Sequence, residues 1–339
     1  MAEIFIDLSR TPTAKEKQAL HRRRKRLEVA GLAKHLDDIE ESLLTFKRPW
    51  STLEAGGLRV RSTFSWLRTP IPGDASDRKA PPRELRPSAT RIGSSTGSAL
   101  RLELIAMAVA QLRRKAGAAA HLAELSIPIA GSPDTIGWAD LVAVQPTDSN
   151  SGGVFHRARD KRARTVRTAL DTLEAAGLVD IAGDPGARNR YENFVLLNES
   201  GLASVGERQE YTTPKTSEFM FTMPPGFVLN NWMHVLEDSE ISVLLMAACG
   251  AGAWADEGLW AFPGYVRLRH YGIHRDPFAQ ARKTLEWLGL LQVHEVGRHE
   301  DGRAEDDAQR VHRIGLDRTA FEKPALPTMR TMIQRQLER

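Results

Sequence analysis

The chain has 339 residues, 41% of them hydrophobic, so it is long enough for more than one domain and apolar enough to build cores. No stretch approaches the roughly 20 apolar residues that span a membrane, and the first residues lack the layout of a secretory signal. The single cysteine excludes an intramolecular disulfide and a zinc site built from several cysteines. We therefore expect a cytoplasmic protein with no membrane contact.

The net charge of +4 is unevenly distributed along the chain. Residues 1–100 contain 19 Lys and Arg against 12 Asp and Glu, whereas residues 201–339 contain 16 against 19. The cationic first hundred residues favour a polyanionic partner. Arginine outnumbers lysine 36 to 11, which fits phosphate and base recognition but equally fits a G+C-rich genome.

The N-terminal segment is predicted to be helical. Thr13 and Glu16 form a capping-box pattern, and leucines follow at helical spacing. The run RRRKR at residues 22–26 indicates either a solvated helix face or an arm that contacts phosphates, and the sequence leaves its role open. Residues 68–97 are rich in proline and arginine and poor in large apolar residues, so we expect a linker that packs no core.

The next segment predicts three helices followed by two strands. Leu104, Ile105, Ala108 and Leu112 give the first helix, 98–116, one apolar face. Helices at 138–144 and 159–176 follow, separated by a polar break at 146–153, and Gly177 stands where a left-handed helix cap belongs. Apolar runs at 178–181 and 194–197 flank a turn and predict a strand pair.

The same order of elements recurs later in the chain. TLEAAGLVDI at 172–181 and TLEWLGLLQV at 284–293 match at five positions with an offset of 112 residues. Helices are expected from Asp238, at 263–271 and from Asp276, with strands at 290–296 and 311–316. The repeat therefore extends to whole units, although the two units differ in length.

Helix, glycine, strand, turn and strand resemble the recognition helix and wing of the winged helix-turn-helix superfamily. Two such units in one chain resemble tandem winged-helix plasmid replication initiators and winged-helix transcriptional regulators. The resemblance implies a mainly α protein with small β-hairpin wings (α+β) that binds double-stranded DNA. The expected division is an N-terminal helical basic segment (1–67), a linker (68–97), a first winged-helix domain (98–205), a second (206–322) and a C-terminal amphipathic helix (323–339).

The strongest functional signal is HRARDKRARTVR at 156–167, which holds six cations and one acid in the first half of the expected recognition helix. We expect base contacts from Arg159, Arg162 and Thr165, because arginine can bridge guanine with two hydrogen bonds. Phosphate contacts are expected from Arg157, Lys161 and Arg164, and Arg167 completes the cationic helix. At the first wing we expect minor-groove or phosphate contacts from Arg188, Asn189 and Arg190.

The second unit is less cationic. Its predicted DNA-contacting residues are His274, Arg275, Gln280, Arg282 and Lys283. Its wing is dominated by the acidic loop 300–307, which phosphate would repel. Either this wing points away from DNA, or the second domain contacts proteins, including a second copy in a homodimer.

No catalytic, metal or cofactor residue is assigned. The chain has no phosphate-binding G-x-x-x-x-G-K-[ST] motif, and no third ligand accompanies His270 and His274. We therefore predict a non-enzymatic, nucleoid- or plasmid-associated protein that binds duplex DNA sequence-specifically, as a replication initiator or a transcriptional regulator. A winged-helix scaffold acting through protein contacts is the alternative, and a DNA-nicking or DNA-cleaving enzyme comes third.

Overall fold

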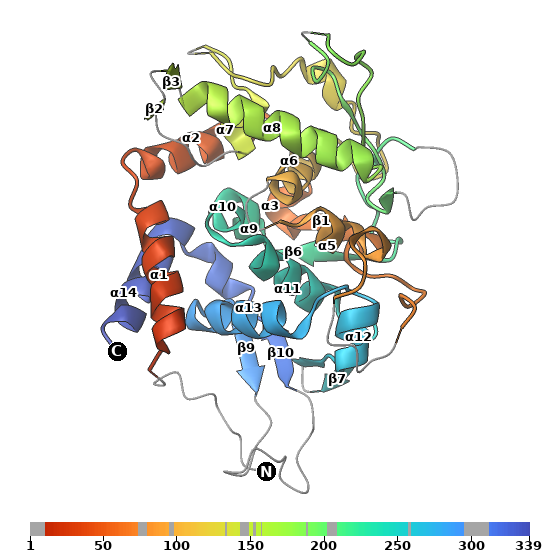
Figure 1. Cartoon of the computed structure of the whole chain (residues 1–339). Coiled ribbons are helices and arrows are strands. Elements are labelled where there is room, and N and C mark those ends of the chain that lie inside the picture. Colours follow the sequence, from red (N-terminus) through yellow and green to blue (C-terminus); the bar gives the residue numbers. More distant parts are fainter. Residues whose placement is uncertain are drawn as a thin grey trace, which may run out of the picture.

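Helices predominate in this chain, and the strands pair into small antiparallel sheets (Figure 1). The structure is a computed structural model. It describes residues 11–73, 80–94, 98–132, 134–142, 149–151, 154–156, 158–187, 189–201, 209–256, 259–294 and 312–339. The expected α+β class with a helical majority is confirmed.

The first helical unit lies at the top of Figure 1. Its elements are α6 (Ala99–Arg113), η2 (Leu122–Leu125), α7 (Trp138–Val142), β2 (Ser149–Ser151), β3 (Val154–His156), α8 (Ala158–Ala175), β4 (Val179–Asp180) and β5 (Val195–Leu196). Both α6 and α7 pack against α8, and β4 pairs with β5 in antiparallel fashion. The three expected helices and the strand pair are confirmed, with small shifts at their ends.

The helix α6 differs from the amphipathic helix that we expected. Leu104 and Ala108 are buried, but so are Leu102, Met107 and Val109 on its other sides. The helix is enclosed because α8 covers one side while α2, α3 and β1 cover others. A helix that is apolar all round is typical of such a central position.

The second helical unit lies in the lower half of Figure 1. It consists of α11 (Asp238–Cys249), β7 (Trp254–Asp256), β8 (Leu259–Ala261), α12 (Gly264–Arg269), α13 (Arg275–Trp287), β9 (Leu291–His294) and β10 (Arg313–Leu316). The four strands form one sheet in the order β7-β8-β10-β9, and α11 packs against α13. The hairpins β2–β3 and β7–β8 were not predicted, because each consists of strands of only three residues.

The remaining elements come from both ends of the chain and from between the units. They are α1 (Ala14–Leu27), α2 (Leu32–Thr45), α3 (Leu53–Gly56), β1 (Leu58–Arg61), α4 (Ser62–Ser65), η1 (Arg83–Leu85), α5 (Ser88–Ile92), β6 (Met220–Met223), α9 (Pro225–Leu229), α10 (Trp232–Val235), η4 (Thr319–Glu322) and α14 (Ala325–Leu337). The capping box of Thr13 and Glu16 is present, and α14 buries Met329, Met332 and Ile333 against its neighbours. The predicted helices at both ends of the chain are thus confirmed.

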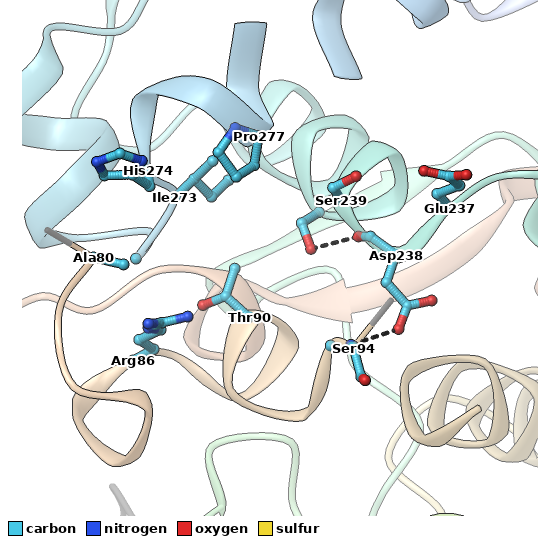
Figure 2. Close-up of a pocket in the computed structure, with 13 residues that line it drawn as sticks. Ala80, Arg86, Thr90, Ser94, Glu237, Asp238, Ser239, Ile273, His274 and Pro277 are labelled. Carbon is cyan, nitrogen blue, oxygen red and sulfur yellow. Dashed lines mark hydrogen bonds between the residues drawn. The ribbon is translucent and has the colours of Figure 1, made fainter. Parts of the chain in front are cut away.

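Part of the expected linker is folded into the body. Residues 88–92 form α5, whose Ala89 and Ile92 are buried in the core. The backbone N–H of Ser94 donates a hydrogen bond of 2.9 Å to Asp238 at the start of α11 (Figure 2). The few apolar residues of this segment suffice because α4, α6 and α11 supply the rest of its packing surface.

The two helical units end in the same backbone motif. The N–H of Gly177 bonds to the carbonyl of Glu174, and the N–H of Leu178 bonds to that of Leu173. Residues 112 positions later repeat both bonds, from Gly289 to Glu286 and from Leu290 to Leu285. Both glycines have positive φ, 69° and 72°, which closes each helix in a Schellman motif. The sequence repeat is therefore a structural repeat.

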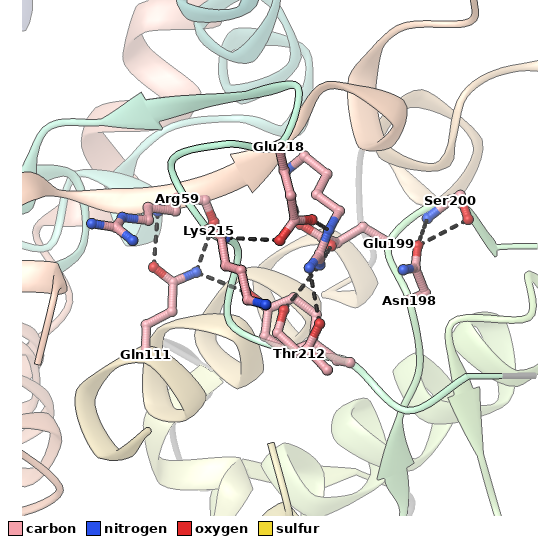
Figure 3. A network of polar contacts seen from close by, with 10 residues as sticks. Arg59, Gln111, Asn198, Glu199, Ser200, Thr212, Lys215 and Glu218 are labelled. Atoms are coloured by element: carbon pink, nitrogen blue, oxygen red, sulfur yellow. Dashed lines mark hydrogen bonds and ion pairs between the residues drawn. The ribbon is translucent and has the colours of Figure 1, made fainter. Parts of the chain in front are cut away.

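The two units are joined through the strand pair β1–β6 (Figure 3). The guanidinium of Arg61 on β1 donates to Glu199 and to Glu218 at 2.5 Å each, and to the carbonyl of Thr212 at 2.9 Å. Glu199 is fully buried, and burial raises its pKa in spite of the neighbouring Arg61.

The helix α6 takes part in the same junction. The side chain of Gln111 accepts from the backbone N–H of Arg59 at 2.9 Å and donates to its carbonyl at 2.7 Å, as a neighbouring strand would. Its amide also donates to the hydroxyl of Tyr211 at 2.8 Å. The polar network thus connects α6 and the end of the first unit to β1, which pairs with the strand leading into the second unit.

Truncation of the repeated leucine tests the structural equivalence of the units. Leu173 and Leu285 are both 0% exposed, so Leu173→Ala and Leu285→Ala should each lower the free energy of unfolding by about 2–5 kcal/mol. Urea denaturation measures this loss. An unchanged midpoint for either variant would show that its leucine does not occupy the equivalent core position.

Removal of Arg61 tests the junction. Arg61→Met should lower the free energy of unfolding by about 3–5 kcal/mol, because Glu199 would remain buried without its partner. The double variant Arg61→Met with Glu199→Leu should recover much of that loss, since the fully buried carboxylate is then gone and Glu218, whose side chain is 32% exposed, remains hydrated. A double variant that is as unstable as the sum of the two single variants would contradict this account of the pair.

Candidate nucleic-acid interface

The helix α8 lies on the outside of the first unit and turns one face toward solvent (Figure 1). Its opposite face packs on α6 and α7 through Ala163, Val166, Ala169, Leu170 and Leu173. Arg159, Arg164, Arg167 and Thr168 are exposed, and Lys161, Arg162 and Thr165 are half-buried. The spacing of 161, 164 and 168 places these residues in one stripe opposite the buried face.

The structure separates the cations of α8 into different roles. The guanidinium of Arg162 lies 3.5 Å from the carboxylate of Asp140 on α7, on the side of the helix nearest the core. Arg159 donates to the carbonyl of Ala130 at 3.3 Å. The exposed Arg164 instead belongs to the outward stripe, so it has the better position for an external partner.

Thr165 was expected to contact a base. Its hydroxyl donates to the carbonyl of Lys161 at 3.0 Å, one turn earlier in α8. The hydroxyl hydrogen is thus used within the helix, as is common for threonine. Thr168, which the sequence analysis did not select, is exposed on the outward stripe. Helical periodicity measured from the buried Val166 and Leu170 would have indicated it.

The turn between β4 and β5 carries the predicted wing residues. Asn189 is exposed, whereas Arg190 pairs with Glu174 of α8 at 2.9 Å and lies over the ring of Tyr191, 5.3 Å from its centroid. Arg190 therefore fastens the turn to α8. Arg157 and Arg188 lie outside the described residues.

The helix α13 offers fewer contacts than we expected. Arg275 and Gln280 are exposed, and His274 is half-buried at the helix start. Lys283 pairs with Glu16 of α1 at 2.8 Å. Arg282 was expected to contact DNA, but it is only 5% exposed and packs in the interior, where it cannot reach a duplex. The acidic loop 300–307 lies outside the described residues.

The basic run at 22–26 is largely engaged within the protein. Arg23 is buried and donates to both carboxylate oxygens of Glu240 at 2.6 Å. Arg26 pairs with Glu237 at 2.7 Å, and Arg24 lies 3.5 Å from Glu28. The pairs with Glu237 and Glu240 hold α1 against the second unit, and the sequence could not show them because these acids lie more than 200 residues away.

A pocket of about 270 Å³ separates the 80–94 segment from the starts of α11 and α13 (Figure 2). Arg86, Asp238, Ser242 and His274 are among its lining residues. Asp238 accepts from Ser94 and pairs with Arg101 at 3.1 Å, and Arg86 donates to the carbonyl of Pro81. Asp238 thus connects the start of α11 to the 80–94 segment and to α6, while Arg86 bonds within its own segment.

The described residues form neither a metal-binding cluster nor a membrane-spanning helix. No group of three or more His, Cys, Asp or Glu side chains in that part of the chain is placed to hold a metal ion. His270 bonds through Nδ1 to the carbonyl of Leu67 and stacks on Trp66. No helix among the described residues has the length and apolar character to cross a membrane.

Comparisons with protein-family models, with curated proteins and with solved structures found no match to this chain. The functional interpretation therefore rests on the residues and their geometry.

Proposed function

We propose that the chain is a tandem winged-helix protein that binds double-stranded DNA sequence-specifically, as a replication initiator or a transcriptional regulator. In both units a helix is followed by a strand or bridge segment, two further helices and a strand pair, which supports this proposal; in the first unit the hairpin β2–β3 is inserted before α8. In the first unit, isolated bridges join Ala119 to Thr212 and Leu197 to Glu210 beside the β4–β5 pair. In the second, β8 lies against β10.

The observation that carries the proposal is the outward face of α8. Its buried face is fully used in packing, which leaves Arg164, Arg167 and Thr168 exposed on the other faces and Lys161 half-buried beside them. Cations on an exposed recognition helix suit the phosphates and guanine edges of a major groove. Arg162, which is paired with Asp140, serves to orient α8 on α7.

A second candidate function, protein assembly, is favoured by two exposed aromatic side chains. Phe219 is 63% exposed beside β6, and Trp254 is 67% exposed on β7. Large apolar groups in such positions are typical of protein interfaces. Self-association without duplex affinity would favour this function over the first.

Duplex binding measured over a range of salt concentrations tests the proposal. The affinity should fall with salt, and Arg164→Ala should reduce the magnitude of the log–log slope by about 1, because one phosphate contact is lost. Arg162→Ala, the matched control on the same helix, should leave the slope nearly unchanged because its guanidinium is paired with Asp140. Absence of duplex binding at low salt, or an equal effect of the two variants, would contradict the proposal.

A further inference from the structure

The helix α1 is fixed beside α13 by contacts between distant parts of the chain (Figure 1). Its inner side buries Leu20, Arg23 and Leu27. Arg23 makes its paired bonds to Glu240 and a further bond of 2.9 Å to the carbonyl of Val235. The guanidinium of Arg330 on α14 donates to the carbonyl of Leu27. These contacts fix the position of α1 in the folded protein.

A groove of about 340 Å³ runs between α1 and α13. Lys15, Ala19 and Arg22 line it from α1, at a spacing of four and three residues that places them on one side of that helix. Gln280, Lys283 and Trp287 line it from α13. Both walls of the groove are therefore formed by helices.

The charge of the groove is positive because its acids are already paired. Glu16 pairs with Lys283, Glu237 with Arg26 and Glu240 with Arg23. Burial alone would raise the pKa of Glu16, but hydrogen bonds from Lys283 and Thr13 lower it to about 2, so this carboxylate stays ionised with its partner. Lys15 and Arg22 are exposed, and the described residues place no acid against either.

We propose that this groove is a second binding surface for a phosphodiester backbone, formed jointly by α1 and α13. The inference rests on the proposed duplex-binding function and extends it to the second unit. Lys15 and Arg22 supply cations that the groove wall of α13 lacks, since Arg282 is buried and Lys283 is neutralised by Glu16. The amide of Gln280 adds a neutral donor on the opposite wall. The surface positions the duplex and reads no bases.

The test compares the two groove cations with two exposed lysines elsewhere. In the groove variant, Lys15→Gln and Arg22→Gln are combined; in the control, Lys25→Gln and Lys323→Gln are combined. Both remove two exposed cations, but residues 25 and 323 lie outside the groove lining. Duplex affinity is titrated with salt for each full-length variant. The groove variant should lower the magnitude of the log–log slope by about 2, and the control should lower it by less than half as much.

Equal slopes for the groove variant and the control would overturn the proposal, because the cations would then act only through the net charge. The charge-conserving variant Lys15→Arg with Arg22→Lys should retain the wild-type slope, which separates charge from local folding. A loss of slope in this variant too would also overturn it. The proposed function fails separately, if the wild type binds no duplex or if Arg164→Ala has no effect.

Discussion

The buried guanidinium of Arg61 determines how the two helical units are held together. It lies on β1, yet its acceptors are Glu199 and Thr212 at the end of the first unit and Glu218 just before β6. Glu199 is fully buried, so the carboxylate requires a cation beside it in the folded state. Because β1 also pairs with β6, this one residue joins the first unit to the strand that leads into the second. Together with the pair of Arg101 on α6 and Asp238 on α11, this junction places α8 relative to α13.

The two helical units share one backbone arrangement but have different surroundings. Both third helices end in a Schellman motif and bury the equivalent leucine, so the scaffolds agree at the backbone. Their outer faces differ. The helix α8 presents its own cations. In α13, by contrast, Arg282 is buried and Lys283 pairs with Glu16 of α1. The N-terminal helix thus belongs to the second unit in space, although more than 200 residues separate them in sequence.

Local patterns predicted the long helices, several of their caps and the strand pairs β4–β5 and β9–β10. Thr13 and Glu16 lie three residues apart, and Gly177 and Gly289 need only the preceding helix to define their conformation. The site was predicted less well, because whether a cation faces solvent or forms an ion pair inside the protein depends on a partner distant in sequence. Asp140 engages Arg162, Glu240 engages Arg23 and Glu16 engages Lys283. The composition of residues 68–97 led us to expect no core packing there, which is wrong for residues 88–92. Their two buried apolar side chains pack on surfaces supplied by other segments.

Covalent labelling of lysine amines, with and without bound duplex, tests the central claim that the outer face of α8 meets DNA. Lys161 lies on that face, and Lys323 is an exposed lysine between η4 and α14. Saturating duplex should protect Lys161 from the reagent while Lys323 reacts as before. Equal labelling of Lys161 in the free and bound protein would contradict the account.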